Sequence, residues 1–397
     1  MDKADTAWIM VSTALVMLMT PGLALFYAGM ARKKNVLGTM MHSFFILCLI
    51  SIMWVMWGYS LSFGKDIGGF VGGLNHLFLN GVGTEANGTI PHLVFMMFQG
   101  MFAVITVALI TGGFAERIKF SAMVIFSLLW ATFVYAPLCH WVWGGGWLGE
   151  LGALDFAGGM VVHISCGVSA LVAALVIGKR RGYPKELMPP HNLGLTIIGM
   201  GLLWFGWFGF NAGSALAADG IAALAFVTTN TAAAMGALTW VFVEWVHRGK
   251  PTVLGAVSGA VAGLGSITPA AGFVGPGSAI IIGLVGGGLC YWAVSVIKPR
   301  LGYDDTLDVF GIHGVAGTWG TLSVGLLASV GASGLFFGNP GQLFKQIIGV
   351  GATIAISVVG TFVILKVVDA VVGLRVTEEE EIEGLDYSQH GESGYTW

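Results

Sequence analysis

The chain contains little charge. Only 10% of its 397 residues are Asp, Glu, Lys or Arg, whereas soluble domains carry about 25%. A soluble fold of this length could not cover so much apolar surface, so a water-soluble globular protein is excluded. The formal net charge of −3 says nothing about partners, because the positions of the charges matter more in a membrane protein. The sequence has no basic face for nucleic acid, so we expect no nucleic-acid partner.

Cysteine and proline are scarce as well, with 4 and 11 residues. The cysteines have neither paired spacing nor a CxxC motif, which favours packing roles over disulfides or metal binding. Their positions are Cys48, Cys139, Cys166 and Cys290. No metal-binding spacing such as HExxH occurs, so the sequence predicts no metal and no other cofactor.

Hydrophobic residues, in contrast, make up 56% of the chain. Apolar runs of about 20 residues, the length of one helical membrane crossing, recur along it. These runs do not alternate with the period of two that a transmembrane β-barrel requires. The 62 glycines, many of them inside the runs, suit close helix contacts. We expect an all-α integral membrane protein.

The polar clusters between the runs predict eleven transmembrane helices. Their approximate limits are 6–30, 37–63, 91–113, 120–139, 158–177, 191–211, 221–246, 252–270, 277–297, 309–328 and 341–372. The first run has no small-residue cleavage site, so it is expected to remain in the mature protein. Residues 1–373 would form the transmembrane domain and residues 374–397 a C-terminal tail.

Most of the 18 basic residues follow odd-numbered helices of this scheme, as the positive-inside rule requires of cytoplasmic loops. They are Arg32, Lys33, Lys34, Arg117, Lys119, Lys179, Arg180, Arg181, Lys185, Arg248, Lys250, Lys298, Arg300 and Arg375. The scheme predicts a multi-pass protein of the cell (inner) membrane, with the N-terminus outside and the tail in the cytoplasm. By composition alone, the acidic run at 378–381 allows a solvated, partly disordered tail.

Two predicted helices begin with an acid and then a histidine. Asp155 precedes His163, and Asp308 precedes His313. Ionisable groups inside a bilayer are costly, so each is a candidate functional residue. A lone buried histidine is more often a packing residue, but matched positions in two oppositely oriented five-helix halves favour a pathway between the halves.

Aromatic residues cluster near the predicted outer ends of the third to sixth helices. The cluster comprises Phe98, Phe102, Trp141, Trp143, Trp147, Phe208 and Phe210. An interfacial aromatic belt explains the tryptophans equally well, and ordinary packing explains the i, i+4 pair of phenylalanines. Composition and spacing leave these alternatives open.

Several motifs in order along the chain carry a family resemblance. They are PGLALFYAGM (21–30), FQG (98–100), AER (115–117), DFAGG (155–159), WFGFNAGS (207–214), FGIHGVAG (310–317) and GLDYSQHGE (384–392). The chain resembles the ammonium transporter family (Amt/Mep/Rh), in particular its bacterial and archaeal Amt branch. The resemblance implies eleven transmembrane helices in an inverted five-helix repeat plus a last peripheral helix, assembled as a homotrimer with one pore per subunit.

The resemblance also implies three groups of site residues. An outer ammonium recruitment site would comprise Phe98, Trp143 and Ser214, with Asp155 supporting it from behind; Phe102 and Phe210 would form a gate; and His163 and His313 would form a twin-histidine pair in the pore. No nucleophile or metal set accompanies the histidines, so we expect no enzyme.

The expected function is ammonium or ammonia transport across the membrane. The alternative is a sensor or receptor that binds ammonium with little or no transport. Expected partners are ammonium, membrane lipids and, at the cytoplasmic face, a PII-type regulatory protein. Whether the proton of ammonium crosses with the nitrogen stays open.

Overall fold

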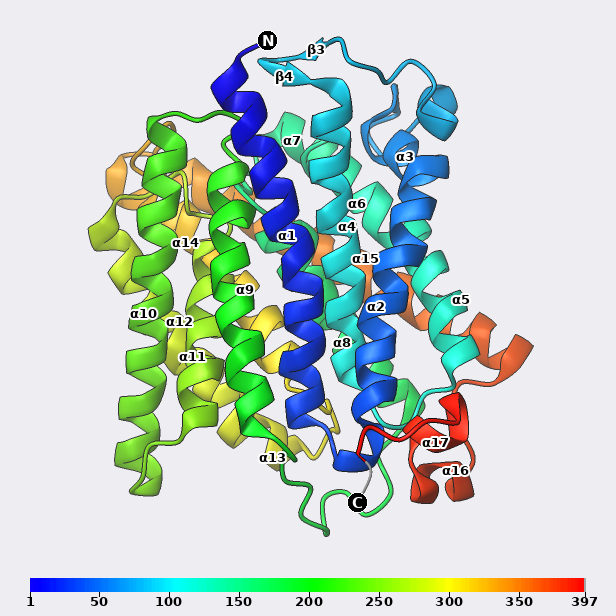
Figure 1. The fold of residues 1–397 in the computed structure, drawn as a ribbon. Coiled ribbons are helices and arrows are strands. Elements are labelled where there is room, and N and C mark those ends of the chain that lie inside the picture. Colours follow the sequence, from blue (N-terminus) through cyan, green and yellow to red (C-terminus); the bar gives the residue numbers. More distant parts are fainter. Residues whose placement is uncertain (396–397) are drawn as a thin grey trace.

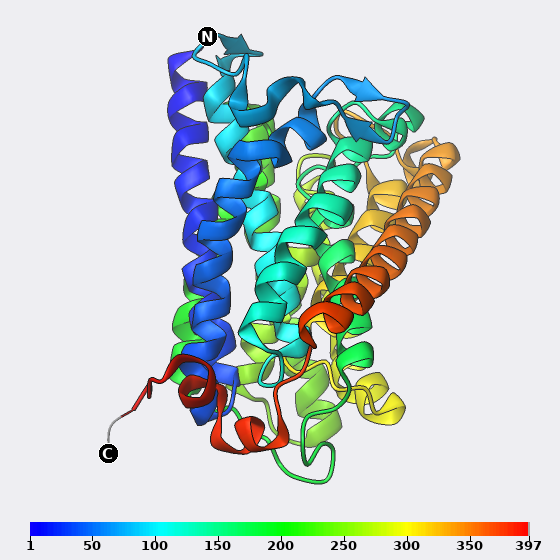
Figure 2. The ribbon, with the colours of Figure 1, turned by 90° about the vertical axis from the view of Figure 1, so that its right-hand side faces the viewer.

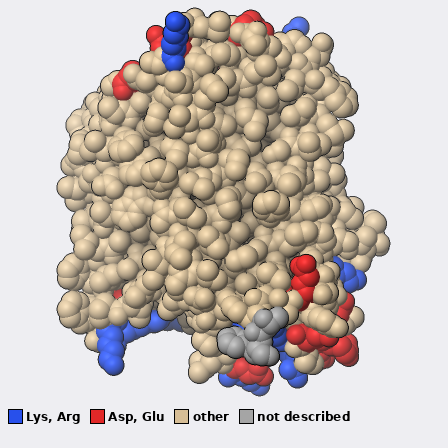
Figure 3. All heavy atoms as spheres, viewed as in Figure 1, with Lys and Arg blue, Asp and Glu red and all other residues tan. Residues whose placement is uncertain are grey.

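A computed structural model describes residues 1–395 as a bundle of long helices that run between two opposite ends (Figure 1). The N-terminus lies at one end and the C-terminal segment at the other. We call these ends the N-terminal face and the tail face. Charged side chains gather at both faces in the view of Figure 3, and a wide uncharged band separates them. Such a band is what a lipid-exposed surface requires.

The long helices follow the apolar runs. Their bounds are α1 Lys3–Met30, α2 Val36–Met53, α4 His92–Phe114, α5 Phe120–Trp130, α6 Ala136–Val142, α8 Ser165–Ile177, α9 Leu193–Gly213, α10 Gly220–Arg248, α11 Val253–Ile267, α12 Pro276–Trp292, α14 Val315–Leu327 and α15 Pro340–Val372. Single π-helical turns extend four of them, at η2 Trp54–Gly58, η4 Ala131–Tyr135, η6 Ala293–Ile297 and, before α8, η5 Gly159–Ile164. A fifth such turn, η7 Phe310–Gly314, precedes α14.

The remaining elements are short. On the N-terminal side they are α3 Tyr59–Phe63, the antiparallel pair β1 Asp66–Ile67 and β2 Val71–Gly72, η3 Leu74–Leu79, the antiparallel pair β3 Ala86–Asn87 and β4 Ile90–Pro91, α7 Trp147–Leu151 and η8 Leu335–Phe337. On the tail side they are η1 Lys33–Asn35, α13 Lys298–Leu301, α16 Glu378–Glu383 and α17 Leu385–His390.

Nine helices within residues 1–395 are long and apolar enough to cross a membrane. The other two expected crossings, 252–270 and 309–328, coincide with the 15-residue α11 and with η7 followed by α14. These two are shorter or less apolar because many of their residues are Gly, Ser and Thr. The protein is therefore a multi-pass membrane protein, while the count of eleven stays a prediction.

Glycines bring α10 and α11 into backbone contact. A Cβ added to Gly236 of α10 would lie 2.5 Å from the carbonyl oxygen of Gly259 and 2.8 Å from the Cα of Gly263, both in α11. Only glycine permits this approach, which is how helices associate where lipid removes the hydrophobic driving force. Glycines of the kind noted in the sequence thus allow these two helices to cross in close contact.

The last long helix lies outside the bundle. α15 has 33 residues and slants across the outer surface, where it packs on α5, α8 and α14 (Figure 2). Its length exceeds the ~20 residues of a perpendicular crossing, and tilting accommodates the excess.

A buried arginine joins loops at the tail face. Arg117 is fully buried, and its guanidinium donates to the hydroxyl of Thr306 and to the carbonyl oxygens of Asp304 and Gly178. Beside it, Arg180 donates to the carboxylate of Asp304 at 2.7 Å. Burial alone would raise the pKa of Asp304, but the hydrogen bonds and charge of Arg180 hold that pKa below its ordinary value.

The tail is docked on the tail face. The side chain of Asn35 accepts from the backbone N–H of Leu385 at 2.8 Å, and Asp386 accepts from the N–H of Gly38 at 2.7 Å. Lys34 donates to the carbonyls of Glu381 and Ile382. The partly disordered tail that composition allowed is therefore not what residues 374–395 form; Thr396 and Trp397 lie outside the described residues.

Removing the Asn35 acceptor should release the tail. Asn35→Ala leaves the buried N–H of Leu385 unpaired, which costs about 1–3 kcal/mol, so a glutamate-specific protease should cleave the tail roughly fivefold faster or more. Arg181→Ala is the control, because its ion pair with Glu378 is more than half exposed (52% and 68%) and worth about 0–1 kcal/mol. Equal cleavage rates in both variants would argue against docking through Asn35.

Candidate functional site

A cavity of about 340 Å³ opens near the N-terminal face, and we call it the outer cavity. Its walls come from α4, α6, α9 and the segment before η5, and they include Phe95, Gln99, Phe102, Trp143, Asp155 and Ser214. Aromatic faces, a hydroxyl and an amide therefore surround one space. Four of the expected site residues, Phe102, Trp143, Asp155 and Ser214, meet here.

Asp155 caps the helix that carries His163. One carboxylate oxygen accepts from the backbone N–H groups of Gly158 and Gly159, and the other accepts from those of Met160 and Val161, at 2.6 to 3.2 Å. These bonds use both oxygens and place a negative charge at a helix N-terminus, where it is stabilised. The carboxylate thus supports the floor of the outer cavity.

The indole of Trp143 and the hydroxyl of Ser214 are fixed by their own hydrogen bonds. Trp143 Nε1 donates to the carbonyl oxygen of Asp155 at 2.9 Å, which holds the ring against the cavity. Ser214 Oγ donates to the carbonyl of Phe210 at 2.9 Å, so its lone pairs can still accept. The cavity therefore offers an aromatic face and a hydroxyl acceptor.

Two phenylalanine rings pack together between the outer cavity, which Phe102 lines, and a second space, which Phe210 lines. Phe102 and Phe210 have ring centroids 4.4 Å apart and an interplanar angle of 37°, and each is 1% exposed. Phe98 is fully buried and does not line the cavity; its ring packs edge-on against Phe102 at 4.9 Å. Phe98 therefore lies behind Phe102 and affects the outer cavity only by supporting that ring.

A second, narrow space lies on the other side of the Phe102–Phe210 pair, and we call it the inner cavity. Its walls are mainly aliphatic and aromatic, and they include Leu23, Leu109, Val162, Trp207, His163 and His313. About 10 Å³ is open to the centre of a water-sized molecule, which is roughly the room for one water. The inner cavity is thus an apolar space with two imidazoles.

The two imidazoles form a pair. Their Nδ1 atoms lie 3.2 Å apart, and the rings are nearly parallel with centroids 5.3 Å apart. In a neutral pair one Nδ1 donates to the other, so one Nε2 is left as an acceptor and the other as a donor. The Nε2 of His163 is buried and has no partner in residues 1–395. The pair can therefore accept a proton or hydrogen bond from a guest and donate one to it.

Asp305, rather than Asp308, resembles Asp155 in its spacing and contacts. Each of Asp155 and Asp305 precedes its histidine by eight positions, since 163 − 155 and 313 − 305 are equal, and each accepts from the backbone N–H five residues later at 2.7 Å. Asp308 instead forms an ion pair with Lys298 at 2.6 Å. Asp305 lies in a loop at the tail face, where burial raises its pKa to about 6.

Glycines set the separation of the two imidazoles. A Cβ on Gly167 would strike the backbone of Gly314, the residue after His313, and a Cβ on Gly317 would lie 2.7 Å from the Cβ of His163. The helices after η5 and η7 therefore cross in backbone contact directly beside the histidines.

The structure adds one polar group that the sequence did not single out. Gln99 lines the outer cavity, is 8% exposed, and its Oε1 has no hydrogen-bond partner in the part of the chain that is described. It is an acceptor beside the aromatic walls. Its position in the FQG motif, one residue after Phe98, was the sequence feature that could have identified it.

No cluster of three or more His, Cys, Asp or Glu with metal-binding geometry occurs between residues 1 and 395.

The fold and the site define a class: a multi-pass helical membrane protein with an aromatic outer cavity and a buried imidazole pair on the two sides of a phenylalanine pair. The chain belongs to the Ammonium Transporter Family, whose family model matches residues 7–395. The ammonium transporter of Bacillus subtilis is 54% identical over 403 residues, covering 100% of this chain and 99% of that protein. Ammonium transporter Amt1 of Archaeoglobus fulgidus is 53% identical over 400 residues, with 100% of both chains covered.

Solved structures agree with the fold. The crystal structure of Saccharomyces cerevisiae Mep2 matches with a TM-score of 0.89 at 38% identity, over 96% of this chain and 88% of that one. A structure described as a Sensor Amt Protein matches with a TM-score of 0.92 at 30% identity, over 98% of each chain.

Proposed function

We propose that the protein conducts ammonium across the membrane, from the outer cavity past Phe102 and Phe210 to the His163–His313 pair. The observation that carries the proposal is that two cavities with different linings lie on either side of one phenylalanine pair. The outer cavity is lined by aromatic and polar groups, and the inner cavity is mainly apolar with two imidazoles. The outer cavity suits a cation, and the inner cavity suits a small neutral molecule. Relatives named as transporters support the same reading and favour it over catalysis.

Recruitment would rely on the aromatic walls of the outer cavity. A partly desolvated cation over an indole face gains roughly 2 kcal/mol. Trp143 would supply that face, and Ser214 would accept a hydrogen bond from the ion, as Gln99 can. Phe98 would act by holding Phe102, and Asp155 by holding Trp143 through its backbone carbonyl.

Passage beyond the gate of Phe102 and Phe210 would select by chemistry. An apolar space penalises any bare ion, and potassium has no way to lower its charge. Ammonium can leave its proton behind, and neutral ammonia can then exchange hydrogen bonds with the free Nε2 positions of His163 and His313. This selection holds whichever route the released proton takes.

The proposed topology has eleven crossings, with two inverted five-helix halves followed by α15. The matched Asp155/His163 and Asp305/His313 segments support the repeat. The protein would lie in the inner membrane with its N-terminus outside. Residues 1–373 would be the transmembrane domain and residues 374–397 a cytoplasmic tail. The basic loops at the tail face support this orientation.

The proposed assembly is a homotrimer with one pore per subunit. A PII-type regulatory protein would bind the tail face, where the docked tail lies beside the basic loops. Membrane lipids would contact the uncharged band.

Transport and sensing differ in one measurement. Proteoliposomes of the purified chain should show an ammonium-dependent change of lumenal pH or a current that exceeds that of protein-free vesicles. Ammonium binding without any excess over protein-free vesicles would support a receptor instead.

Trp143→Leu should weaken recruitment. Loss of about 2 kcal/mol of cation–π attraction raises the half-saturating ammonium concentration roughly 30-fold, with the maximal rate less affected. Trp141→Leu is the matched control, because Trp141 donates to the carbonyl of Phe70 at 2.8 Å and lies outside the outer cavity. Equal shifts in both variants would remove Trp143 from the recruitment site.

A further inference from the structure

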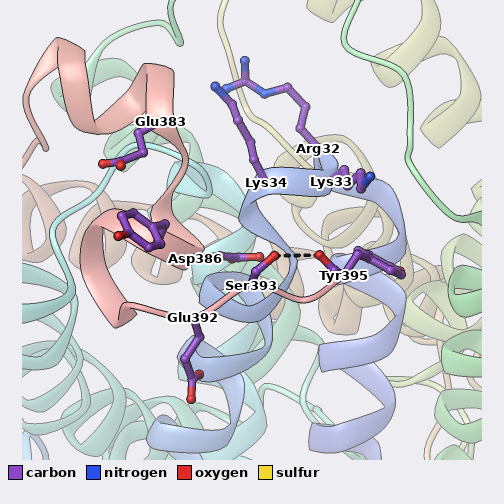
Figure 4. A pocket seen from close by; sticks show the side chains of 9 residues that line it. Arg32, Lys33, Lys34, Glu383, Asp386, Glu392, Ser393 and Tyr395 are labelled. Atoms are coloured by element: carbon purple, nitrogen blue, oxygen red, sulfur yellow. Dashed lines mark hydrogen bonds between the residues drawn. The ribbon is translucent and has the colours of Figure 1, made fainter. Parts of the chain in front are cut away.

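Two adjoining hollows lie where the docked tail meets α1 and α2. The first is a polar cavity of about 560 Å³. Three consecutive cations, Arg32, Lys33 and Lys34, line it together with acids of the tail (Figure 4). Cations and carboxylates therefore face one space at the tail-side edge of the bundle.

The second hollow is an apolar groove of about 640 Å³ between α1 and α2. Its walls include Ala24 and Leu25 of α1 and Met41 and Phe44 of α2. The groove extends from the tail face to Pro21, nine residues before the end of α1, or about 14 Å at 1.5 Å per residue. That length is close to the ~15 Å hydrocarbon depth of one leaflet.

Glu392 of the tail lines both hollows and so connects them. Figure 4 shows its side chain extending away from Arg32 and Lys34, alongside the blue helices. Its carboxylate makes no hydrogen bond or ion pair with any other residue of the described chain. Glu392 is exposed, so its carboxylate is open to a cationic partner from outside the chain.

A second acceptor in the same corner also lacks a donor. Asp386 is 4% exposed; its Oδ1 accepts from the N–H of Gly38, but its Oδ2 has no partner within residues 1–395. On the cationic side, Nη2 of Arg32 is likewise unpaired within that range. Lys34 donates to two carbonyls and keeps a third N–H. Asp386 Oδ2 and Arg32 Nη2 are buried, and the Nε of Arg32 already pairs with Glu116, so Lys34 and Glu392 offer the accessible donor and acceptor to a guest.

We propose that this corner binds an aminophospholipid of the phosphatidylethanolamine type from the leaflet on the tail side. One acyl chain lies in the groove between α1 and α2, the primary ammonium pairs with Glu392, and the phosphate pairs with the 32–34 cations. A primary ammonium has three N–H donors for the carboxylates, whereas a choline headgroup has none. A purely anionic headgroup brings no cation to Glu392. The proposal does not depend on transport.

Native mass spectrometry of the delipidated full chain tests the headgroup. Phosphatidylethanolamine, phosphatidylcholine and phosphatidylglycerol with identical acyl chains are titrated separately. The ethanolamine lipid should bind about tenfold more tightly than the choline lipid, the factor expected for one charge-assisted hydrogen bond. Equal binding of all three, or tighter binding of the glycerol lipid, would overturn the headgroup assignment.

Two variants locate the site. Glu392→Gln should abolish the preference for ethanolamine over choline, whereas Glu379→Gln, an exposed acid on the same tail outside both hollows, should preserve it. Ala24→Phe fills the groove and should lower binding of all three lipids about tenfold or more. Ala14→Phe, an exposed position on α1 away from the groove, should not.

The same spectra report the oligomeric state. If Ala24→Phe changes the number of subunits while Ala14→Phe does not, a second copy of the chain fills the groove and the lipid proposal fails. A retained ethanolamine preference in Glu392→Gln would also contradict it.

Discussion

His163→Ala and His313→Ala should each lower ammonium flux by tenfold or more, with the helical bundle intact. Each substitution removes one member of the Nδ1–Nδ1 pair at 3.2 Å and leaves the other without a fixed tautomer. Loss of one hydrogen bond to a guest in a low-dielectric space, about 1.5–3 kcal/mol, corresponds to roughly 10- to 100-fold in rate. Stopped-flow measurement of lumenal pH in proteoliposomes gives the rates.

The matched control is His42→Ala. His42 is as buried as the pair, at 3% exposure, but it packs against Phe114 and Phe120 and lines neither cavity. Its removal should leave the flux within about twofold of wild type, since that flux does not depend on it. Unchanged flux and selectivity in both His163→Ala and His313→Ala would refute a pore role for the pair.

Gly167→Val should strongly destabilise the folded protein. Its side chain would collide with the backbone of Gly314, and a helix backbone cannot move aside as a flexible side chain can. Overpacking a core costs about 1–3 kcal/mol, and a collision with backbone costs more. The helices would have to separate, which would also move His163 away from His313.

Thermal unfolding in detergent, followed by scattering and size-exclusion profile, measures this effect. Gly351→Val is the control, because Gly351 lies on α15 and a Cβ there meets nothing within 4 Å. Gly167→Val should unfold at least about 5 °C below wild type or fail to give a single species, while Gly351→Val should match wild type. Similar stability of the two variants would contradict the close crossing.

The long helices were predictable because apolar runs and polar breaks are local features of the sequence. The third expected crossing, 91–113, and α4, His92–Phe114, differ by one residue at each end. The π-helical turns at His163 and His313 were not predictable, since a wider turn changes no apolar residue to a polar one. The weak runs at 252–270 and 309–328 form helices inside the bundle, and their glycines lie against the backbones of neighbouring helices.

The candidate site was less accessible to sequence reasoning. Three acids, Asp304, Asp305 and Asp308, lie near the tenth predicted helix, and only their contacts distinguish them: Arg180, the N–H of Phe310 and Lys298, respectively. The position of Phe98 behind Phe102 depends on ring orientation, which the i, i+4 spacing does not determine. That Gln99 Oε1 has no hydrogen-bond partner likewise depends on the residues around it in the fold, which the sequence does not give.

The docking of the tail depended on contacts between distant parts of the chain. Asn35 and Leu385 are 350 positions apart, and acidic composition says nothing about such a partner. Composition alone therefore allowed a solvated end, although the tail contains helices with a capping box at Thr377 and Glu380.

Flux through proteoliposomes with potassium as competitor tests the central claim most directly. Wild-type vesicles should pass ammonium at least about tenfold faster than protein-free vesicles, and the rate should saturate with ammonium. Potassium at a roughly hundredfold higher concentration should carry no current above that of protein-free vesicles, even where it competes for the outer cavity, because potassium cannot shed a proton before the apolar inner cavity. A potassium current of similar size, or an ammonium rate equal to that of protein-free vesicles, would contradict the account.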